Sequence, residues 1–127
     1  MKTIVMIAML VVATIVNADG ETPVMVGGND GLDACMTLGA VVSKKGAKSE
    51  VAIYSKPDQE SSIVDKLKSG TRVMFCDSSG DDWVGVVFSG DDAPYCGVTS
   101  PIEPRQPYQG ECKSGWVERS NTEALAG

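Results

Sequence analysis

The chain has 127 residues, 43% of them hydrophobic, with a formal net charge of −6 and no histidine. That length suits one domain, and an acidic chain without a lysine or arginine cluster gains little from contact with nucleic acid or anionic lipid. The absence of histidine removes the usual general base, the Ser-His-Asp and Cys-His catalytic pairs and any imidazole metal site. We therefore expect a protein that is not an enzyme, carries no cofactor or metal and does not bind nucleic acid.

The first eighteen residues, MKTIVMIAMLVVATIVNA, have the layout of a secretory signal peptide. A lysine precedes an apolar run, and Val16 and Ala18 fit the positions just before a cleavage site. The alternative is an uncleaved anchor, although a spanning helix normally needs roughly 20 apolar residues. We predict a signal peptide at residues 1–18 and an exported chain with no stable membrane insertion after cleavage.

The predicted mature chain begins with a flexible segment and two apolar segments. The sequence DGETPVMVGGND is rich in glycine and polar residues, which predicts a flexible lead-in over residues 19–31. Residues 34–43, ACMTLGAVVS, and residues 51–55, VAIYS, favour strands. Residues 61–70, SSIVDKLKSG, fit either one amphipathic helical turn or a strand that leads into a turn at Ser69-Gly70.

A hairpin is expected in the middle of the chain. Residues 71–77, TRVMFCD, alternate in the manner of a strand, residues 78–82, SSGDD, have dense turn chemistry, and residues 83–88, WVGVVF, run back. Gly85 within the return strand indicates a bulge or a close approach of another group to the backbone.

The remaining elements complete an all-β prediction. After a proline-bearing loop, residues 114–119, SGWVER, favour a last short strand, and residues 123–127 are expected to be a tail. Several strands of about five residues with turns at short intervals are typical of a small barrel or sandwich. We place this domain at residues 32–122, with an interior filled by side chains rather than by a ligand.

Four cysteines, Cys35, Cys76, Cys96 and Cys112, follow the predicted cleavage point. An even number in a small exported domain predicts two disulfides, since a zinc site would lack both a CxxC pair and histidine. Three pairings are possible from the sequence. We favour Cys96–Cys112 and Cys35–Cys76, because the first would close a proline-rich loop with few ladder donors, at about 3 kcal/mol of stabilisation.

The order of these motifs resembles the bacterial SH3-like domain, often called SH3b, over about residues 50–120. The motifs are a strand ending in a proline turn at Pro57, an apolar stretch ending at Gly70, the hairpin from Val73 to Val86, and Gly115-Trp116-Val117. The cysteine-bearing form is similar to a group of exported bacterial SH3 proteins. The resemblance implies a small SH3-like barrel of about five to seven short strands, stapled by two disulfides, in the periplasm or outside the cell.

The same resemblance implies a function. It indicates a non-catalytic binding module that recognises cell-wall peptide or glycan, or another envelope protein. The alternative is an accessory or inhibitor protein that blocks the surface of a partner enzyme. Ile53-Tyr54 stands where the family often has Val-Arg, and Lys56-Pro57 where it often has Gly-Pro, so contacts made by that arginine or glycine do not carry over.

Five aromatic residues are the candidate ligand-binding residues: Tyr54, Trp83, Tyr95, Tyr108 and Trp116. Aromatic rings offer large contact area at low entropic cost, and they suit a groove for peptide or glycan. For each tryptophan the alternative is a place in the core of the domain.

Two further groups of residues have competing interpretations. The segment from Pro101 to Pro107, with a proline at every third position, either lies across the groove of the domain or is a loop held by a disulfide. Asp81-Asp82 and Asp91-Asp92 follow turn residues without the spacing of an EF-hand or any sign of a catalytic cleft. We predict that these aspartates are solvated turn residues.

Overall fold

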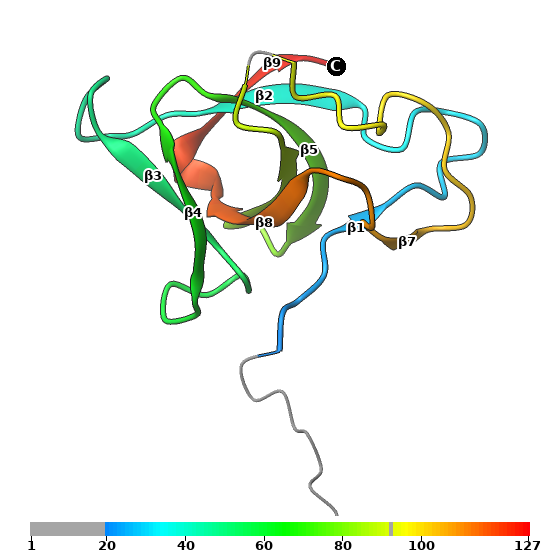
Figure 1. The fold of residues 1–127 in the computed structure, drawn as a ribbon, viewed down its shortest axis with the longest axis horizontal. Coiled ribbons are helices and arrows are strands. Elements are labelled where there is room, and N and C mark those ends of the chain that lie inside the picture. The colour runs from blue at the N-terminus through cyan, green and yellow to red at the C-terminus, as the bar shows by residue number, and fades with distance from the viewer. Residues whose placement is uncertain (1–19, 92) are drawn as a thin grey trace, which may run out of the picture.

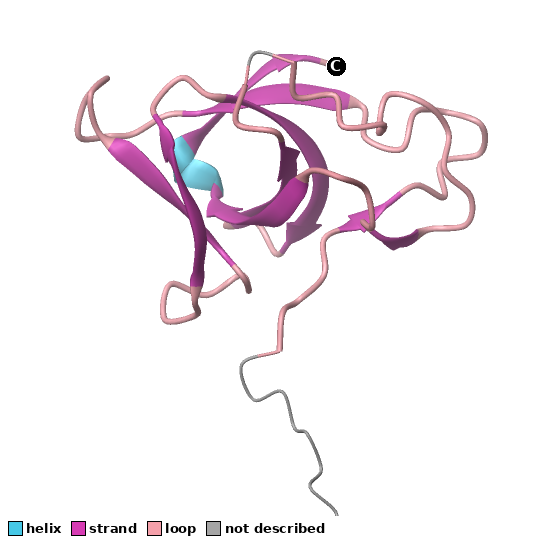
Figure 2. Ribbon diagram, viewed as in Figure 1, coloured by secondary structure: helices cyan, strands magenta, loops and turns pink. Residues whose placement is uncertain are grey.

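The computed structural model describes residues 20–91 and 93–127, so the predicted signal peptide at residues 1–18 lies outside the described part of the chain, as does Asp92. Within that part the chain is all-β, with nine strands and one short 3-10 helix, η1, at Arg119–Asn121 (Figure 2). The strands are β1 (Met25–Val26), β2 (Thr37–Val41), β3 (Glu50–Tyr54), β4 (Ile63–Lys68), β5 (Arg72–Ser79), β6 (Trp83–Phe88), β7 (Gln106–Pro107), β8 (Lys113–Glu118) and β9 (Thr122–Ala126).

Seven strands form one antiparallel sheet in the order β4-β3-β8-β6-β5-β2-β9, and β1 pairs with β7 in a separate sheet of two strands. Figure 1 shows that the large sheet curls strongly. Its edge strands β4 and β9 are nevertheless not hydrogen-bonded to each other within the described residues. The all-β prediction is therefore confirmed, whereas the predicted closed barrel of five to seven strands is wrong.

The β3–β4 hairpin joins the rest of the sheet through a narrow junction, because β3 and β8 share a single registered pair, Tyr54 with Trp116. The additional strands β1, β7 and β9 come from segments in which the sequence has no alternating pattern. A strand of two residues depends on its partner rather than on its own sequence, so such elements escape prediction from local periodicity.

The predicted hairpin is present as β5 and β6. Residues 63–68 form a strand, β4, so the helical alternative for that segment is wrong. The β5–β6 register shifts opposite Gly85, between Phe75 and Asp77. A Cβ at this position would lie 2.9 Å from Asp77 Cβ, 3.1 Å from Val24 Cγ1 and 3.3 Å from the Trp116 ring. This glycine therefore lets two side chains pack onto the sheet.

The central strand β6 is buried on both faces, because its side chains alternate between two cores. The first core lies on one face of the sheet and consists of Val41, Val51, Ile53, Leu67, Val73, Val84, Val86, Phe88 and Val117. The second core lies on the other face and consists of Val24, Val26, Ala34, Cys35, Met74, Val87, Val98 and Trp116. Two segments that lie outside the large sheet, residues 20–36 and 93–112, supply the cover for the second core.

The N-terminal segment is packed onto the sheet. The side chains of Val24 and Val26 are only 1% and 2% exposed, and the N–H of Met25 donates to Asp77 Oδ2 at 3.0 Å. The segment expected to be a flexible lead-in therefore contributes to the fold from residue 20 onward. At the other end, residues 123–126 of the expected tail belong to β9, which pairs with β2.

Both favoured disulfides are present, Cys35–Cys76 and Cys96–Cys112. The first ties the N-terminal segment to β5. The second closes the proline-bearing loop immediately before β8. Together they attach the two covering segments to the sheet, so the second core is held by covalent links as well as by packing.

Asp91 organises the turn after β6. Its Oδ1 accepts hydrogen bonds from the N–H of Ala93 and from the hydroxyl of Ser89, each at 2.8 Å. The Ala93 bond and, second to it, the Ser89 bond lower the pKa of Asp91 below its ordinary value. Since the folded pKa is lowered, the carboxylate stabilises this turn above its pKa in the unfolded chain, and the contribution is lost as pH falls through the folded pKa.

We expect the Ser89→Ala variant to raise the pKa of Asp91 only part of the way to its ordinary value, because the Ala93 N–H still donates to the carboxylate. An NMR titration of the Asp91 side-chain carboxyl carbon measures this change. Ser78→Ala, which removes an exposed hydroxyl elsewhere, is the control and should leave the pKa of Asp91 unchanged. An unaltered Asp91 titration in Ser89→Ala would contradict the assigned cause.

Candidate functional site

Tyr54 and Trp83 meet on the surface at the end of the sheet. Tyr54 ends β3 and Trp83 begins β6, and the two strands flank β8. Their ring centroids are 5.8 Å apart with an interplanar angle of 84°, an edge-to-face contact between two half-buried rings. Aromatic pairs favour this geometry, so the contact fixes both side chains without covering them.

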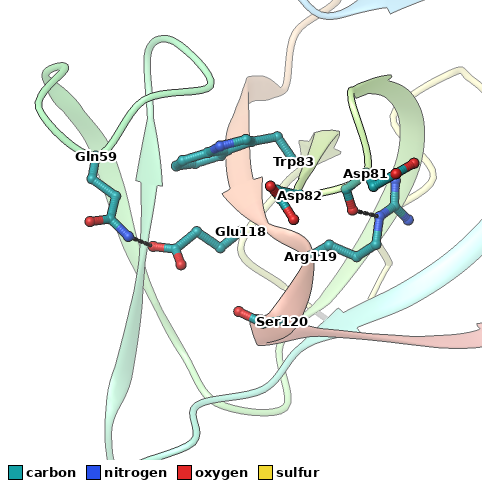
Figure 3. A pocket seen from close by; sticks show the side chains of 7 residues that line it. All are labelled: Gln59, Asp81, Asp82, Trp83, Glu118, Arg119 and Ser120. Carbon is teal, nitrogen blue, oxygen red and sulfur yellow. Dashed lines mark hydrogen bonds between the residues drawn. The ribbon is translucent and has the colours of Figure 1, made fainter.

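A hollow of about 420 Å³ lies beside Trp83 (Figure 3). It is lined by Gln59, Asp81, Asp82, Trp83, Glu118, Arg119 and Ser120. A second hollow of about 330 Å³ includes Tyr54 in its lining and shares Glu118 and Ser120 with the first. Because the two hollows share lining residues and each contains one ring of the Tyr54–Trp83 pair, we treat them as one surface and call it the aromatic groove.

Hydrogen bonds fix several side chains of the aromatic groove. Gln59 Nε2 donates to Glu118 Oε1 at 2.6 Å, which links the β3–β4 turn to the end of β8. Arg119 Nε donates to the carbonyl of Asp81 at 2.9 Å, and the Arg119 N–H donates to the carbonyl of Asp82 at 2.7 Å. Figure 3 shows the Asp82 and Glu118 carboxylates near the Trp83 ring, while the Arg119 guanidinium points away from it.

The other three aromatic candidates lie elsewhere. Trp116 is 2% exposed in the second core, where its Nε1 donates to the carbonyl of Thr22 at 2.8 Å. The hydroxyl of Tyr108 donates to the Cys96 carbonyl and accepts from the N–H of Cys112, so this ring braces the stapled loop. Tyr95 is 46% exposed but lines neither hollow of the aromatic groove.

Several groove residues were not predicted from the sequence. Gln59, Glu118 and Ser120 carry no motif, and Asp81 and Asp82 were expected to be turn residues only. Their shared location depends on the β3–β4 turn and the end of β8 meeting in space, which no local pattern indicates. The Tyr54 and Trp83 candidates were the only signal in the sequence that pointed to this place.

The proline-bearing segment does not cover the aromatic groove. Its β7 pairs with β1, with Met25 opposite Pro107, and none of residues 101–107 lines either hollow of the groove. Arg105 forms an ion pair with Asp77 at 2.9 Å, which fastens the segment to β5. Residues 101–107 therefore form a loop held by the Cys96–Cys112 disulfide, and the interpretation that they lie across the groove is wrong.

Residues 20–91 and 93–127 contain neither a candidate metal site nor a candidate membrane-spanning helix. No group of three or more histidine, cysteine, aspartate or glutamate side chains in residues 20–91 and 93–127 is placed to hold a metal ion. In the same residues, no helix has the length and apolar character needed to cross a membrane.

The SH3-like resemblance gains no support from known proteins beyond the motifs themselves. Comparisons with protein-family models, with curated proteins and with solved structures found no match.

Proposed function

We propose that this protein is a non-catalytic binding module whose contact surface is the aromatic groove. The observation that carries the proposal is the edge-to-face pair of Tyr54 and Trp83, held half-exposed between two adjoining hollows. Aromatic residues that remain partly exposed on a rigid sheet are suited to binding, because they bury large area without losing much side-chain entropy. The chain has no histidine, which favours binding over catalysis.

The proposed location of this activity is the bacterial periplasm or the outside of the cell. Two disulfides that together use all four cysteines are typical of an exported protein in an oxidising compartment. The signal-like first eighteen residues and the SH3b-like motif order support the same location. The proposed ligand is cell-wall peptide or glycan, or another envelope protein.

We expect the protein to co-sediment with purified peptidoglycan, and Trp83→Ala or Tyr54→Ala to weaken binding at least about tenfold, as for a central aromatic anchor. Either change removes one ring of the pair and leaves the other without its edge contact. The bound fraction, measured over a range of peptidoglycan concentrations, gives the effect.

Tyr95→Ala is the matched control, because it removes an exposed ring that lies outside the groove. Should peptidoglycan fail to bind, a protein from envelope extract that is retained by the unaltered chain and lost by Trp83→Ala would support the envelope-protein form. Undiminished binding of the relevant ligand by both groove variants would overturn the proposed function.

A further inference from the structure

The charges around Trp83 are unbalanced. Asp81, Asp82 and Glu118 bring three carboxylates to the hollow, against the single guanidinium of Arg119. That guanidinium is engaged with the Asp81 carbonyl and is turned away from the ring (Figure 3). Among the described residues it forms no ion pair with Asp82 or Glu118, so negative charge remains next to Trp83.

Two carboxylates elsewhere on the sheet are neutralised by ion pairs. Asp77 pairs with Arg105 at 2.9 Å, and Asp65 pairs with Lys113 at 3.1 Å. The Asp82 side chain, by contrast, has no hydrogen-bonding or charged partner within residues 20–91 and 93–127. Asp82 therefore brings an unpaired carboxylate to the hollow that Trp83 lines.

A ring and carboxylates together select one kind of ligand. Exposed carboxylates alone would simply be hydrated, and a tryptophan alone would accept any flat or apolar group. A cation within about 6 Å of an indole face is attracted by the ring quadrupole, and flanking carboxylates add a charged hydrogen-bond acceptor. The hollow beside Trp83 offers both at once.

The second hollow is balanced in charge. Lys44 and Lys45 line it together with Tyr54, and so do the carboxylates of Glu50 and Glu118. Of the two hollows of the aromatic groove, the one beside Trp83 therefore carries the excess of carboxylates, and a neutral glycan makes no use of that charge.

We infer that the hollow beside Trp83 binds the positively charged side chain of a lysine or arginine residue in a peptide. This inference rests on the proposed function and names the ligand chemistry of the same groove. The Trp83 face and the carboxylates of Asp82 and Glu118 contact the cation. The interaction is exposed, so it weakens as salt is added.

The test uses N-acetyl-lysine-N-methylamide and N-acetyl-norleucine-N-methylamide, a neutral analogue that lacks the ammonium group, as probes of the protein. We expect the lysine probe to shift the Trp83 indole N–H resonance saturably in NMR spectra, and the norleucine probe to bind at least about fivefold more weakly. The Trp116 indole, bonded to Thr22 in the second core, should not move and reports that the fold is intact.

Asp82→Asn should weaken the lysine probe and leave the norleucine probe unchanged. Asp91→Asn is the matched control, because it removes an exposed carboxylate outside the aromatic groove. Equal binding of both probes, or a lysine shift unaffected by Asp82→Asn, would overturn the cation inference while leaving the groove as a binding surface. If neither probe shifts Trp83, the cation inference fails, and the proposed function also fails only if its ligand binds both Trp83→Ala and Tyr54→Ala as well as it binds the unaltered chain.

Discussion

Replacing Trp116 with alanine is expected to lower the free energy of unfolding by about 3–5 kcal/mol, the cost of removing a large aromatic side chain from a core. The ring is 2% exposed and packs in the second core. The change also removes the indole N–H that donates to the carbonyl of Thr22, so the N-terminal segment loses a hydrogen bond as well as a packing partner. Urea denaturation monitored by circular dichroism measures the loss.

Trp116→Phe separates the two contributions, because phenylalanine keeps most of the ring packing and lacks the indole N–H. We expect it to lose clearly less stability than the alanine variant. Trp83→Ala is the second comparison, since this ring is only half-buried and its removal should cost less than that of Trp116. A Trp83→Ala variant less stable than Trp116→Ala would contradict the assignment of Trp116 to the core and Trp83 to the surface.

Removing the Cys35–Cys76 disulfide by changing both residues to alanine is expected to cost about 4 kcal/mol in the chain-entropy account of a loop this long. The two cysteines are 41 residues apart in the sequence, and Cys35 is 2% exposed in the second core. Their loss removes the covalent link between the N-terminal segment and β5, and leaves the segment held by β1 pairing, by the burial of Val24 and Val26, and by hydrogen bonds such as that from Met25 to Asp77. Denaturant midpoints of the oxidised proteins give the measurement.

The Cys96–Cys112 double alanine variant is the matched comparison. It opens a loop with a sequence separation of 16, for which the same account gives about 3 kcal/mol. Both of these cysteines are only half-buried, so less packing is lost with them. A smaller loss of stability from the Cys35–Cys76 variant than from this one would contradict the view that the first disulfide holds the second core.

The sequence could predict those parts of the fold that depend on neighbours along the chain. The hairpin of β5 and β6 follows from alternation over residues 71–77 and turn residues at 78–82, and the disulfide pairing follows from a loop unable to form its own ladder. The second core could not be predicted in this way. Val24 and Val26 belong to a run of only three apolar residues between Pro23 and Gly27, and they pack in the same core as Trp116, ninety or more residues away in the sequence.

The site was predictable only in part for a related reason. Tyr54 and Trp83 were among five aromatic candidates, yet nothing in the sequence distinguished them from Trp116, which carries the same chemical signal and lies in the core. Glu118 joins them through a hydrogen bond with Gln59, 59 residues away in the sequence. Whether a ring is buried or exposed is decided by which segments cover it, and that is a property of the whole chain.

The bond between Trp116 and Thr22 joins residues 94 positions apart. Contacts of such long sequence separation raise the contact order. A high contact order slows folding, because the chain loses the entropy of loop closure before the contact forms and stabilises it. The second core can therefore form completely only when nearly all of the polypeptide has been synthesised and released. A chain built in this way cannot complete its second core while Trp116 is still to be synthesised.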